Sequence, residues 1–507
     1  MSEVILFLLG FIIAAFIVVY IYLTWHFNHW KKLGLAGPKP RIIYGNFPNL
    51  ITGKRNFIYD MDDVYSQYKQ NNSAVGVFMT RYPKILILDP KMAKECMVTN
   101  FRKYRDNVSS KYITNADADK FAARNPFFVT GEDWKVRRAD ALAGLTLHKL
   151  SLAYPIWRAS AKKLEKYLNE LTADRTCEEL DVKDLSYRFT TDILGDFLWG
   201  IDSGALTNTS QSNTIVEMGQ KMLKQSFAAI EHYYSLHLVP FMRRFLHCNV
   251  FPKETDAFFS NLTKDAMALR LNSPQGDRAD YLNYVMQLQE KKNLSHDDLM
   301  GHTMTVLLDG FETSAILLYH TLFYLAKYSQ VQDKLRAEIK ANLEKDGSLT
   351  FETLNKLEYL DQCVHETLRL VTLLPTFSRI CTEDTTLEVE LDKSISVKRG
   401  TVIIVPIFSF HHDPEYFPDP YKYYPERFDN GAHVEMTKRG VFMPFGDGPR
   451  ICIGMRMGLI EVKMAIVEIL KQYRLLSSKR TMAEKKPDAS SFIFGLSGEF
   501  WLDFERI

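Results

Sequence analysis

The sequence predicts a mainly helical protein with small β-sheets, an α+β fold in which one large body follows a single N-terminal membrane helix. Three observations carry this prediction. The N-terminus is long, apolar and uncharged, and helical patterns dominate residues 131–340. Only short segments are typical of strands, at 76–80, 85–89, 387–405, 491–494 and 500–504.

The N-terminal segment is apolar enough to cross a membrane. Residues 4–23 contain no charged side chain, and a helix of that length spans about 30 Å, one bilayer core. A cleaved signal peptide is the alternative. It is disfavoured because the apolar run is too long, no basic residue precedes it and no small-residue cleavage motif follows. Lys31 and Lys32 follow the run, so the positive-inside rule places the remaining chain on the cytosolic side.

The order of segments favours fewer domains than the roughly three that a length of 507 residues suggests. Residues 1–25 form the membrane anchor, and residues 26–40 form a stiff linker that contains two prolines. Residues 41–507 form one body, because the sequence shows no further linker, repeat or low-complexity tract. The strongest break, residues 272–280, is typical of a loop between helices.

Composition excludes several classes of protein. The 63 basic and 61 acidic residues nearly cancel, so the chain lacks the positive charge of a nucleic-acid-binding protein. The six cysteines are scattered and no C-x-x-C occurs, which argues against zinc ribbons and iron–sulfur sites and fits a reducing compartment. Aromatic residues make up 13% of the chain, which suits a large apolar interior or an apolar ligand.

A second long apolar segment, residues 304–326, carries acidic side chains. Asp309 and Glu312 would each cost about 2.5–3.5 kcal/mol near the centre of a bilayer. We therefore predict a helix through the protein core and not a second membrane span. Buried acids need a partner or a chemical task, and Thr313 follows them directly. A solvated acidic stripe is the alternative.

One cysteine lies in an unusual local sequence. Cys452 ends the segment PFGDGPRIC, in which Gly446, Gly448 and Pro449 force a tight irregular loop. Apolar residues then recur every three or four positions, so we expect a helix to begin directly after the cysteine. A helix N-terminus and the nearby Arg450 both stabilise a thiolate, which can be a nucleophile or a metal ligand. A buried structural thiol is the alternative.

This loop resembles the haem-binding signature of the cytochromes P450, the haem-thiolate monooxygenases. The matching residues are Phe445-x-x-Gly448-x-Arg450-x-Cys452-x-Gly454. Three further motifs resemble family segments and occur in the expected order: Trp134-x-x-x-Arg138, Glu366-Thr-Leu-Arg369 and Pro425-Glu-Arg427-Phe428. With the anchor and the linker, the resemblance covers essentially the whole chain. In style the sequence is similar to membrane-anchored insect microsomal members.

The resemblance implies a cytochrome P450 fold in which residues 41–507 are a catalytic domain that binds haem b. Cys452 would be the axial thiolate ligand of the iron, and Phe445 would pack beside the sulfur. Four side chains would hold the haem propionates: Trp134, Arg138, Arg379 and Arg450. Glu366, Arg369 and Arg427 would form a buried structural network that serves folding and not catalysis.

The resemblance also assigns a task to the 304–326 helix, where dioxygen, the co-substrate, would be activated. Thr313 would bond to dioxygen or its water, Glu312 would relay protons, and Gly310 would loosen the helix. Asp309 departs from the family pattern, which usually has Ala or Gly there. We expect Asp309 to contact a polar or cationic substrate group or to join the proton relay. A helix residue that points away from haem is the alternative.

Electrons must come from another protein, because the sequence contains no dinucleotide-binding G-x-G-x-x-G motif after a strand. The resemblance implies NADPH–cytochrome P450 reductase as the partner, with cytochrome b5 as an optional one, at the endoplasmic reticulum membrane. We expect a basic docking patch made of Lys135, Arg137, Lys438, Arg439 and Arg456. Residues 233–245 mix aromatic and basic side chains and would touch the membrane surface.

The substrate is expected to be a lipophilic small molecule, such as a xenobiotic, an insecticide or a hormone-like compound. Segments that resemble the family's substrate-contact regions are rich in phenylalanine, and an aromatic lining suits such a ligand. The residues are Phe121, Phe127, Phe128, Phe227, Phe377, Phe492 and Phe494. Ordinary core packing is the alternative for each of them.

Three other functions compete with monooxygenation. A haem-thiolate isomerase or dehydratase would rearrange a peroxide without a reductase, and the acid–alcohol pair Glu312-Thr313 disfavours it because such an enzyme needs no proton relay. The same pair and the complete signature disfavour a non-catalytic haem-binding sensor. A membrane-anchored thiol enzyme without haem is the last alternative.

Overall fold

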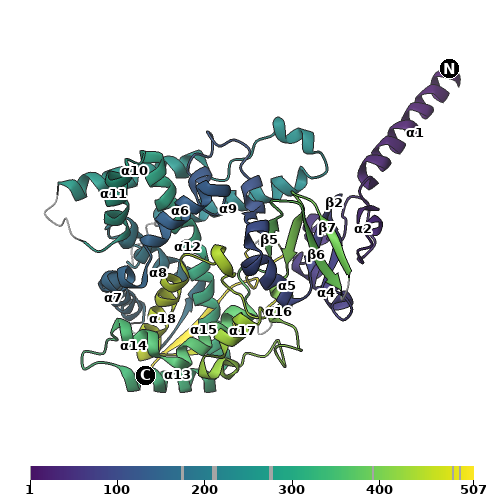
Figure 1. Ribbon diagram of the computed structural model, residues 1–507. Coiled ribbons are helices and arrows are strands. Elements are labelled where there is room, and N and C mark those ends of the chain that lie inside the picture. Colours follow the sequence, from purple (N-terminus) through teal and green to yellow (C-terminus); the bar gives the residue numbers. More distant parts are fainter. Residues whose placement is uncertain are drawn as a thin grey trace.

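Figure 1 shows the computed structural model, which describes residues 2–172, 176–207, 214–272, 278–390, 393–481, 485–489 and 493–507. Helix α1 (Ser2–Thr24) projects alone from a body in which most helices gather on one side. Strands β1, β2 and β5–β7 lie on the other side of the body, toward α1 (Figure 1). The mainly helical fold with small sheets is therefore confirmed.

The helices account for most of the body. The longer ones are α4 (Ile58–Tyr68), α6 (Gly131–Ala143), α7 (Leu147–Leu171), α8 (Val182–Trp199), α9 (Thr214–Ser235), α10 (Lys253–Leu271), α11 (Tyr281–Lys292), α12 (His296–Lys327), α13 (Ser329–Asn342), α15 (Glu358–Leu370) and α18 (Met455–Gln472). The shorter ones are α2 (His29–Lys32), α3 (Asn49–Thr52), α5 (Pro90–Lys94), α14 (Phe351–Lys356), α16 (Ile407–His411) and α17 (Ala432–Lys438).

The strands form three separate sheets. The largest has the order β1-β2-β8-β5-β3, in which only β2 and β8 run parallel. A three-stranded sheet has the order β4-β10-β9, and β6 and β7 form a hairpin. The bounds are β1 (Ala74–Met79), β2 (Tyr82–Ile87), β3 (Asp106–Asn107), β4 (Cys177–Asp181), β5 (Phe377–Ile380), β6 (Thr385–Glu390), β7 (Lys393–Val397), β8 (Val402–Val405), β9 (Tyr473–Ser477) and β10 (Trp501–Arg506).

Most of the strand predictions agree with these sheets. The hairpin predicted around residues 76–89 is confirmed as β1 and β2, and the 387–405 segment supplies β6, β7 and β8. The strand predicted at 491–494 is wrong for residues 493 and 494, which lie in no strand, and residues 491 and 492 lie outside the described residues. Strands β4 and β9 were not predicted, because each is short and pairs with β10, which is distant in sequence.

The anchor helix has the properties of a membrane span. Its residues Glu3–Thr24 have a mean hydropathy of 3.2, and none of that surface is covered by the body. The body holds the end of the helix through the Arg81 guanidinium, which lies 3.7 Å from the ring centre of Tyr22. Just beyond, the Trp30 indole donates to the carbonyl of Val77 and packs on Gly76, where any side chain would collide with it.

The 304–326 segment forms part of a core helix, as predicted. Helix α12 begins at a capping box in which Ser295 and Asp298 satisfy each other's backbone groups. Nearly every side chain from Leu299 to Leu307 is buried, and α12 packs against α8, α15 and α18. The long apolar run therefore reflects burial on all sides of the helix.

A buried ion network ties α15 to the segment that precedes the cysteine loop. Glu366 and Arg369 form a bidentate pair at 2.8 Å with no exposed side-chain surface, and Arg427 reaches the same carboxylate at 3.0 Å. Arg369 also donates to the carbonyls of His411 (2.9 Å) and Pro420 (2.7 Å). Glu366, Arg369 and Arg427 therefore anchor the segment that connects β8 to the cysteine loop.

We expect Arg369→Ala to lower the free energy of unfolding by about 3–5 kcal/mol, because it leaves the Glu366 carboxylate buried with too few partners. Denaturation of the full chain by urea in detergent measures the change. Lys166→Ala is the control, since Lys166 is 80% exposed and its one ion pair among the described residues is with the half-exposed Glu170. Its effect should be below about 1 kcal/mol. Equal shifts for the two variants would contradict the assigned role.

Candidate active site

The cysteine loop is an irregular turn that leads directly into α18, as predicted. Gly446 (φ 74°) and Gly448 (φ 68°) adopt left-handed backbone conformations. A methyl group on Gly448 would lie 2.1 Å from the carbonyl oxygen of Met97, so backbone from another segment closes over the loop. The backbone N–H of Cys452 donates to the carbonyl of Phe445 at 2.9 Å. This bond fixes the cysteine just before the N-terminus of α18, which begins at Met455.

The Cys452 thiol borders a space inside the fold. The residue is exposed, yet its thiol lies so deep in the protein that burial raises its pKa to about 11. The negative charge of Asp309 on α12 adds to the increase. Three groups act in the opposite direction and lower the pKa: the backbone N–H groups of Gly454 and Met455 and the charge of Arg138. Such a thiol becomes a stable thiolate when a metal cation binds it.

A cluster of buried arginines lies beside the loop. Burial lowers the pKa of Arg450 to about 9 and that of Arg379 to about 10, and mutual repulsion among Arg138, Arg379 and Arg450 lowers the values further. Among the described residues, the only carboxylate within ion-pair range is that of Asp106, 3.8 Å from Arg450. The Nε of Arg379 has no hydrogen-bond partner within the described part of the chain. The cluster therefore fits an anionic ligand with more than one carboxylate, as the two propionates of haem provide.

The structure brings the remaining predicted haem residues to the same place. The Arg450 guanidinium lies 4.2 Å from the ring centre of Trp134, which is 5% exposed. Arg138, one turn along α6, donates to the carbonyl of Ile451 in the cysteine loop. Phe445 is partly buried against the core. Residues from α6, β5 and the loop thus converge on the space that Cys452 borders.

Three polar residues of α12 point in different directions. The Thr313 hydroxyl donates to the carbonyl of Asp309 at 2.6 Å. The Glu312 carboxylate turns toward α8, where it accepts from the Tyr187 hydroxyl at 3.2 Å, and burial raises its pKa to about 7. Asp309 is exposed to the internal space, and burial within the fold alone raises its pKa to about 7. The solvated acidic stripe is thereby excluded.

The sequence interpretation missed three residues that support the site. Tyr187 holds Glu312, and Glu461 on α18 lies buried against Ser314 of α12, with its pKa raised to about 8 by burial. His411 accepts from the N–H of Met443 at 3.0 Å and so positions the start of the loop. The segment HHDPEYFPDP contains that histidine, but no spacing rule connects it to a glycine loop.

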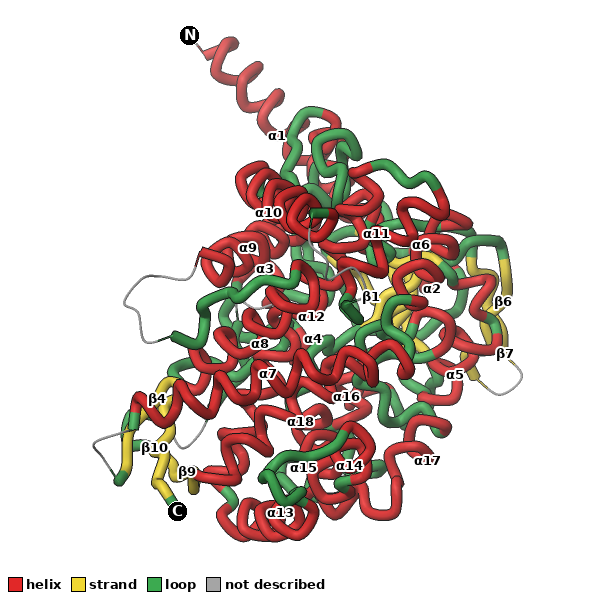
Figure 2. Tube along the Cα trace, turned by 90° about the vertical axis from the view of Figure 1, so that its left-hand side faces the viewer, coloured by secondary structure: helices red, strands yellow, loops and turns green. Residues whose placement is uncertain are grey.

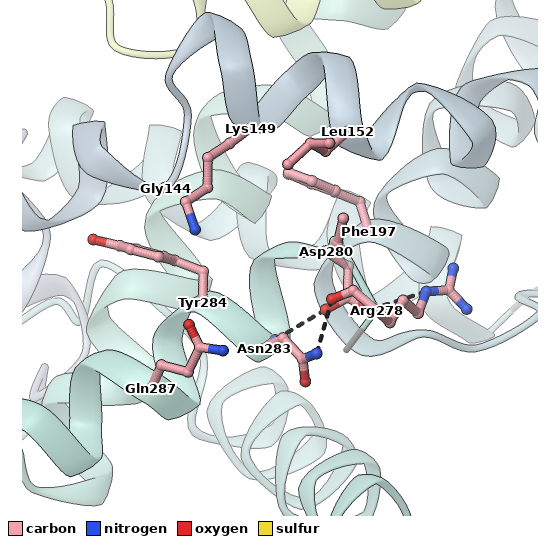
Figure 3. A pocket seen from close by; sticks show the side chains of 10 residues that line it. Gly144, Lys149, Leu152, Phe197, Arg278, Asp280, Asn283, Tyr284 and Gln287 are labelled. Carbon is pink, nitrogen blue, oxygen red and sulfur yellow. Dashed lines mark hydrogen bonds and ion pairs between the residues drawn. The ribbon is translucent and has the colours of Figure 1, made fainter. Parts of the chain in front are cut away.

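A separate small pocket lies away from these residues. Figure 3 shows side chains of α7, α8 and α11 around a cavity of about 160 Å³, with Lys149 and Tyr284 on its rim. Asp280 and Arg278, which line it, already form an ion pair at 3.0 Å. None of the predicted site residues lines this pocket, so the chemistry belongs to the space beside Cys452.

We expect Gly448→Ala to destabilise the protein by at least about 1–2 kcal/mol, because a left-handed conformation strains any residue with a Cβ and the methyl would strike Met97. Thermal unfolding in detergent measures this. Gly458→Ala on α18 is the matched control, since its methyl would meet only the Ser314 hydroxyl at 3.4 Å and alanine favours the helix. Unchanged stability of the Gly448 variant would refute the close packing.

Comparison with known proteins agrees with this geometry. The profile of the cytochrome P450 family matches residues 35–498. The chain is 41% identical over 489 residues to probable cytochrome P450 309a2 of Drosophila melanogaster, which covers 96% of this chain and 90% of that protein. It is 39% identical to probable cytochrome P450 309a1 of the same fly over 97% of both chains. Cytochrome P450 6k1 of Blattella germanica is 28% identical over 93% of this chain and 91% of its own. The chain therefore belongs to the cytochrome P450 family of haem-thiolate monooxygenases.

Proposed function

We propose that this protein inserts one oxygen atom of dioxygen into a lipophilic small molecule, using electrons that reach it from NADPH through a separate reductase. The observation that carries the proposal is that the charge of Asp309, one helical turn before Thr313 on α12, raises the pKa of the Cys452 thiol, which supports a position of that turn near the thiol. A thiolate ligand and an acid–alcohol pair are the two elements that oxygen activation requires.

The cofactor is haem, and this chain's residues suit it. Cys452 would be the axial ligand, Arg138, Arg379 and Arg450 would bind the propionates, and Trp134 would support Arg450 from below its guanidinium. Phe445 would shield the sulfur from water. When bound, haem supplies the redox-active iron at which dioxygen is activated.

Proton delivery is proposed to involve Thr313, Glu312 and Tyr187. The Thr313 hydroxyl donates a hydrogen bond to the carbonyl of Asp309, which leaves the lone pairs of its oxygen free to accept a hydrogen bond from water. With a pKa near 7, Glu312 gains and loses protons readily at neutral pH. Its second oxygen, Oε2, is buried and has no partner among the described residues, so a water molecule enclosed beside it would complete its hydrogen bonding and pass it a proton.

The aromatic lining supports a lipophilic substrate. Phe121, Phe128 and Phe494 are buried, and the Phe377 ring faces Gly446 of the cysteine loop. Phe127 is 40% exposed and does not support the lining. The side chains of Phe227 and Phe492 lie outside what the structure describes.

Membrane attachment is proposed to occur at the endoplasmic reticulum through α1 and a second apolar surface. Phe241 and Phe245, at and just after a short helical turn (Pro240–Arg244), are 66% and 72% exposed. In Figure 2 the N-terminal helix leaves the body at one end. A lipid surface would cover such exposed aromatic side chains and give an apolar substrate a direct route from the bilayer.

Fewer basic residues are available for reductase docking than the sequence predicts. Lys135 and Lys438 lie near acidic neighbours, Glu132 at 3.7 Å and Glu435 at 3.5 Å, and Arg137 is held by Asp133 and Asp298. Arg439 and Arg456 are exposed, and no ion pair to them occurs among the described residues. We therefore propose that these two arginines carry the attraction to an acidic reductase.

Thr313→Ala should uncouple the enzyme, so that NADPH consumption with reductase continues while product falls and peroxide rises several-fold. Coupled turnover should also decline as pH rises past about 7, because Glu312 then loses the proton it donates, and Glu312→Gln should abolish that dependence. Product and peroxide per NADPH are the readouts.

Thr321→Ala is the control for that experiment. Thr321 is buried further along α12 and makes the same bond to the carbonyl four residues earlier, at 2.7 Å, so its replacement should leave coupling unchanged. Product formation from a peroxide without reductase or NADPH would instead support the isomerase or dehydratase. Haem binding without turnover of any lipophilic compound would support the sensor.

Replacing Arg439 and Arg456 together by alanine should weaken reductase affinity about tenfold at low salt and reduce its salt dependence. The Michaelis constant for reductase measures this. Lys398→Ala, in the turn between β7 and β8, removes a charge that already pairs with Asp384 and should have little effect. An unchanged salt dependence in the double variant would place the docking surface elsewhere.

A further inference from the structure

Three side chains that commonly bind metals meet outside the site described above. Asp361 and His365 lie one turn apart on α15, and His433 comes from α17. One ligand atom from each side chain lies within 4.8 Å of the other two. Among the residues that the structure describes, they form the one group of at least three histidine, cysteine or acidic side chains close enough to share an ion. Since positions 361 and 433 are far apart in the sequence, the fold itself assembles this cluster.

The distances within the cluster are close to those of a metal centre. Oδ2 of Asp361 lies 3.0 Å from Nδ1 of His365 and 3.9 Å from Nδ1 of His433. Ligands bound tetrahedrally to zinc at about 2.0–2.2 Å are separated from one another by about 3.3–3.6 Å. The two imidazole rings stack with their centres 4.2 Å apart and their planes at 16°. The side chain of His433 is 29% exposed, so this ring can turn to direct its nitrogen toward a shared ion.

One nitrogen of His433 is left unused by the fold. Its Nδ1 atom is buried and has no hydrogen-bond partner among the described residues. A buried polar atom without a partner is unfavourable. With the ring proton on Nε2, the lone pair of Nδ1 is free to bind a metal ion, which would remove this unfavourable term.

Asp361 has one oxygen available for a metal ion. Its Oδ1 atom accepts from the Lys463 ammonium at 2.6 Å, and Lys463 is buried on α18. This bond orients the carboxylate, and Oδ2 faces the two histidines. The ammonium also repels any second cation, so Lys463 should limit the affinity of the cluster for a metal ion.

His365 must change its tautomer to act as a ligand. Its Nδ1 atom lies 2.8 Å from the Asp361 carbonyl oxygen, which can only accept, so Nδ1 carries the ring proton when no metal is bound. Metal binding through Nδ1 places that proton on Nε2. The bonds that His365 makes to Asp361 are then replaced by bonds from both side chains to the ion.

We propose that Asp361, His365 and His433 bind a zinc ion that ties α17 to α15. Two imidazoles and one carboxylate are a ligand set that suits zinc, and water can fill the fourth position. The Asp361 side chain is 26% exposed, so the ion can enter from solvent. The ion would add a second link beside the bond from Arg427 to Glu366, which already joins this segment to α15. The proposal does not depend on the reaction that occurs at the haem.

The test measures zinc binding by the full-length holoenzyme in detergent. The holoenzyme is used because haem iron then occupies the Cys452 thiolate and keeps it from binding zinc. Zinc is supplied alone through a metal buffer, and the bound metal is quantified after equilibrium dialysis. Thermal unfolding with and without zinc is the second readout, because an ion that binds only the folded state stabilises it.

His433→Phe keeps a ring stacked on His365 but removes both nitrogens. It should weaken zinc binding at least about tenfold and abolish the rise in unfolding temperature that zinc causes in native protein. Lys463→Met removes the competing ammonium and should tighten binding several-fold. His148→Ala is the matched control, because it removes an exposed histidine of α7 and should leave zinc binding unchanged.

Equal zinc binding by native protein and His433→Phe would overturn the proposal. So would binding that is unchanged or weaker in Lys463→Met, since the ion would then not lie on the Asp361 carboxylate. If Lys463→Met does not fold, the comparison of native protein with His433→Phe and His148→Ala decides alone, because both of these positions are at least partly exposed.

Discussion

The rest of the structure depends on the buried network of Glu366, Arg369 and Arg427. Arg369 holds the carbonyl of His411, and the His411 ring accepts from the N–H of Met443, the residue that enters the cysteine loop. Since that bond needs an unprotonated Nε2, the ring proton sits on Nδ1 and faces Thr372 at 3.0 Å. Burial keeps the pKa of His411 well below its usual value, so the ring stays neutral and can accept this bond. The position of Cys452 therefore depends on an ion pair in a different helix.

The second constraint is an interior that holds positive charge without enough negative charge to match it. The side chains of Arg379 and Arg450 are buried and repel each other. Arg450 donates to the carbonyls of Arg105, Pro126 and Val129, but among the described residues the nearest carboxylate is that of Asp106 at 3.8 Å. Burying such charges costs stability unless an anion joins them. Binding a dicarboxylate cofactor therefore removes an unfavourable term from the folded state, so cofactor affinity and folding stability are linked.

Local patterns in the sequence predicted the features that local chemistry determines. The glycine loop, the helix after Cys452 and the pairing of Glu366 with Arg369 depend on residues close together in the chain. Strands β4 and β9 could not be found in this way, since each is defined by β10, which follows far along the chain. Lys135 and Lys438 each lie near an acid three residues earlier in the chain, Glu132 and Glu435. A pattern of basic residues alone does not take these acids into account. The direction of Glu312 depends on how α12 is rotated against α8, which no sequence pattern specifies.

The two acids of α12, Asp309 and Glu312, lie on different faces of the helix. Successive residues of a helix turn by about 100°, so Asp309 and Glu312 lie three residues apart on neighbouring faces. One carboxylate meets the internal space and the other meets Tyr187 of α8, although both lie within one turn of Thr313. Because their surroundings differ, the same burial leaves one acid with a hydroxyl donor and the other with none. A single turn of helix therefore places two acids in different surroundings, and their local partners decide what each can do.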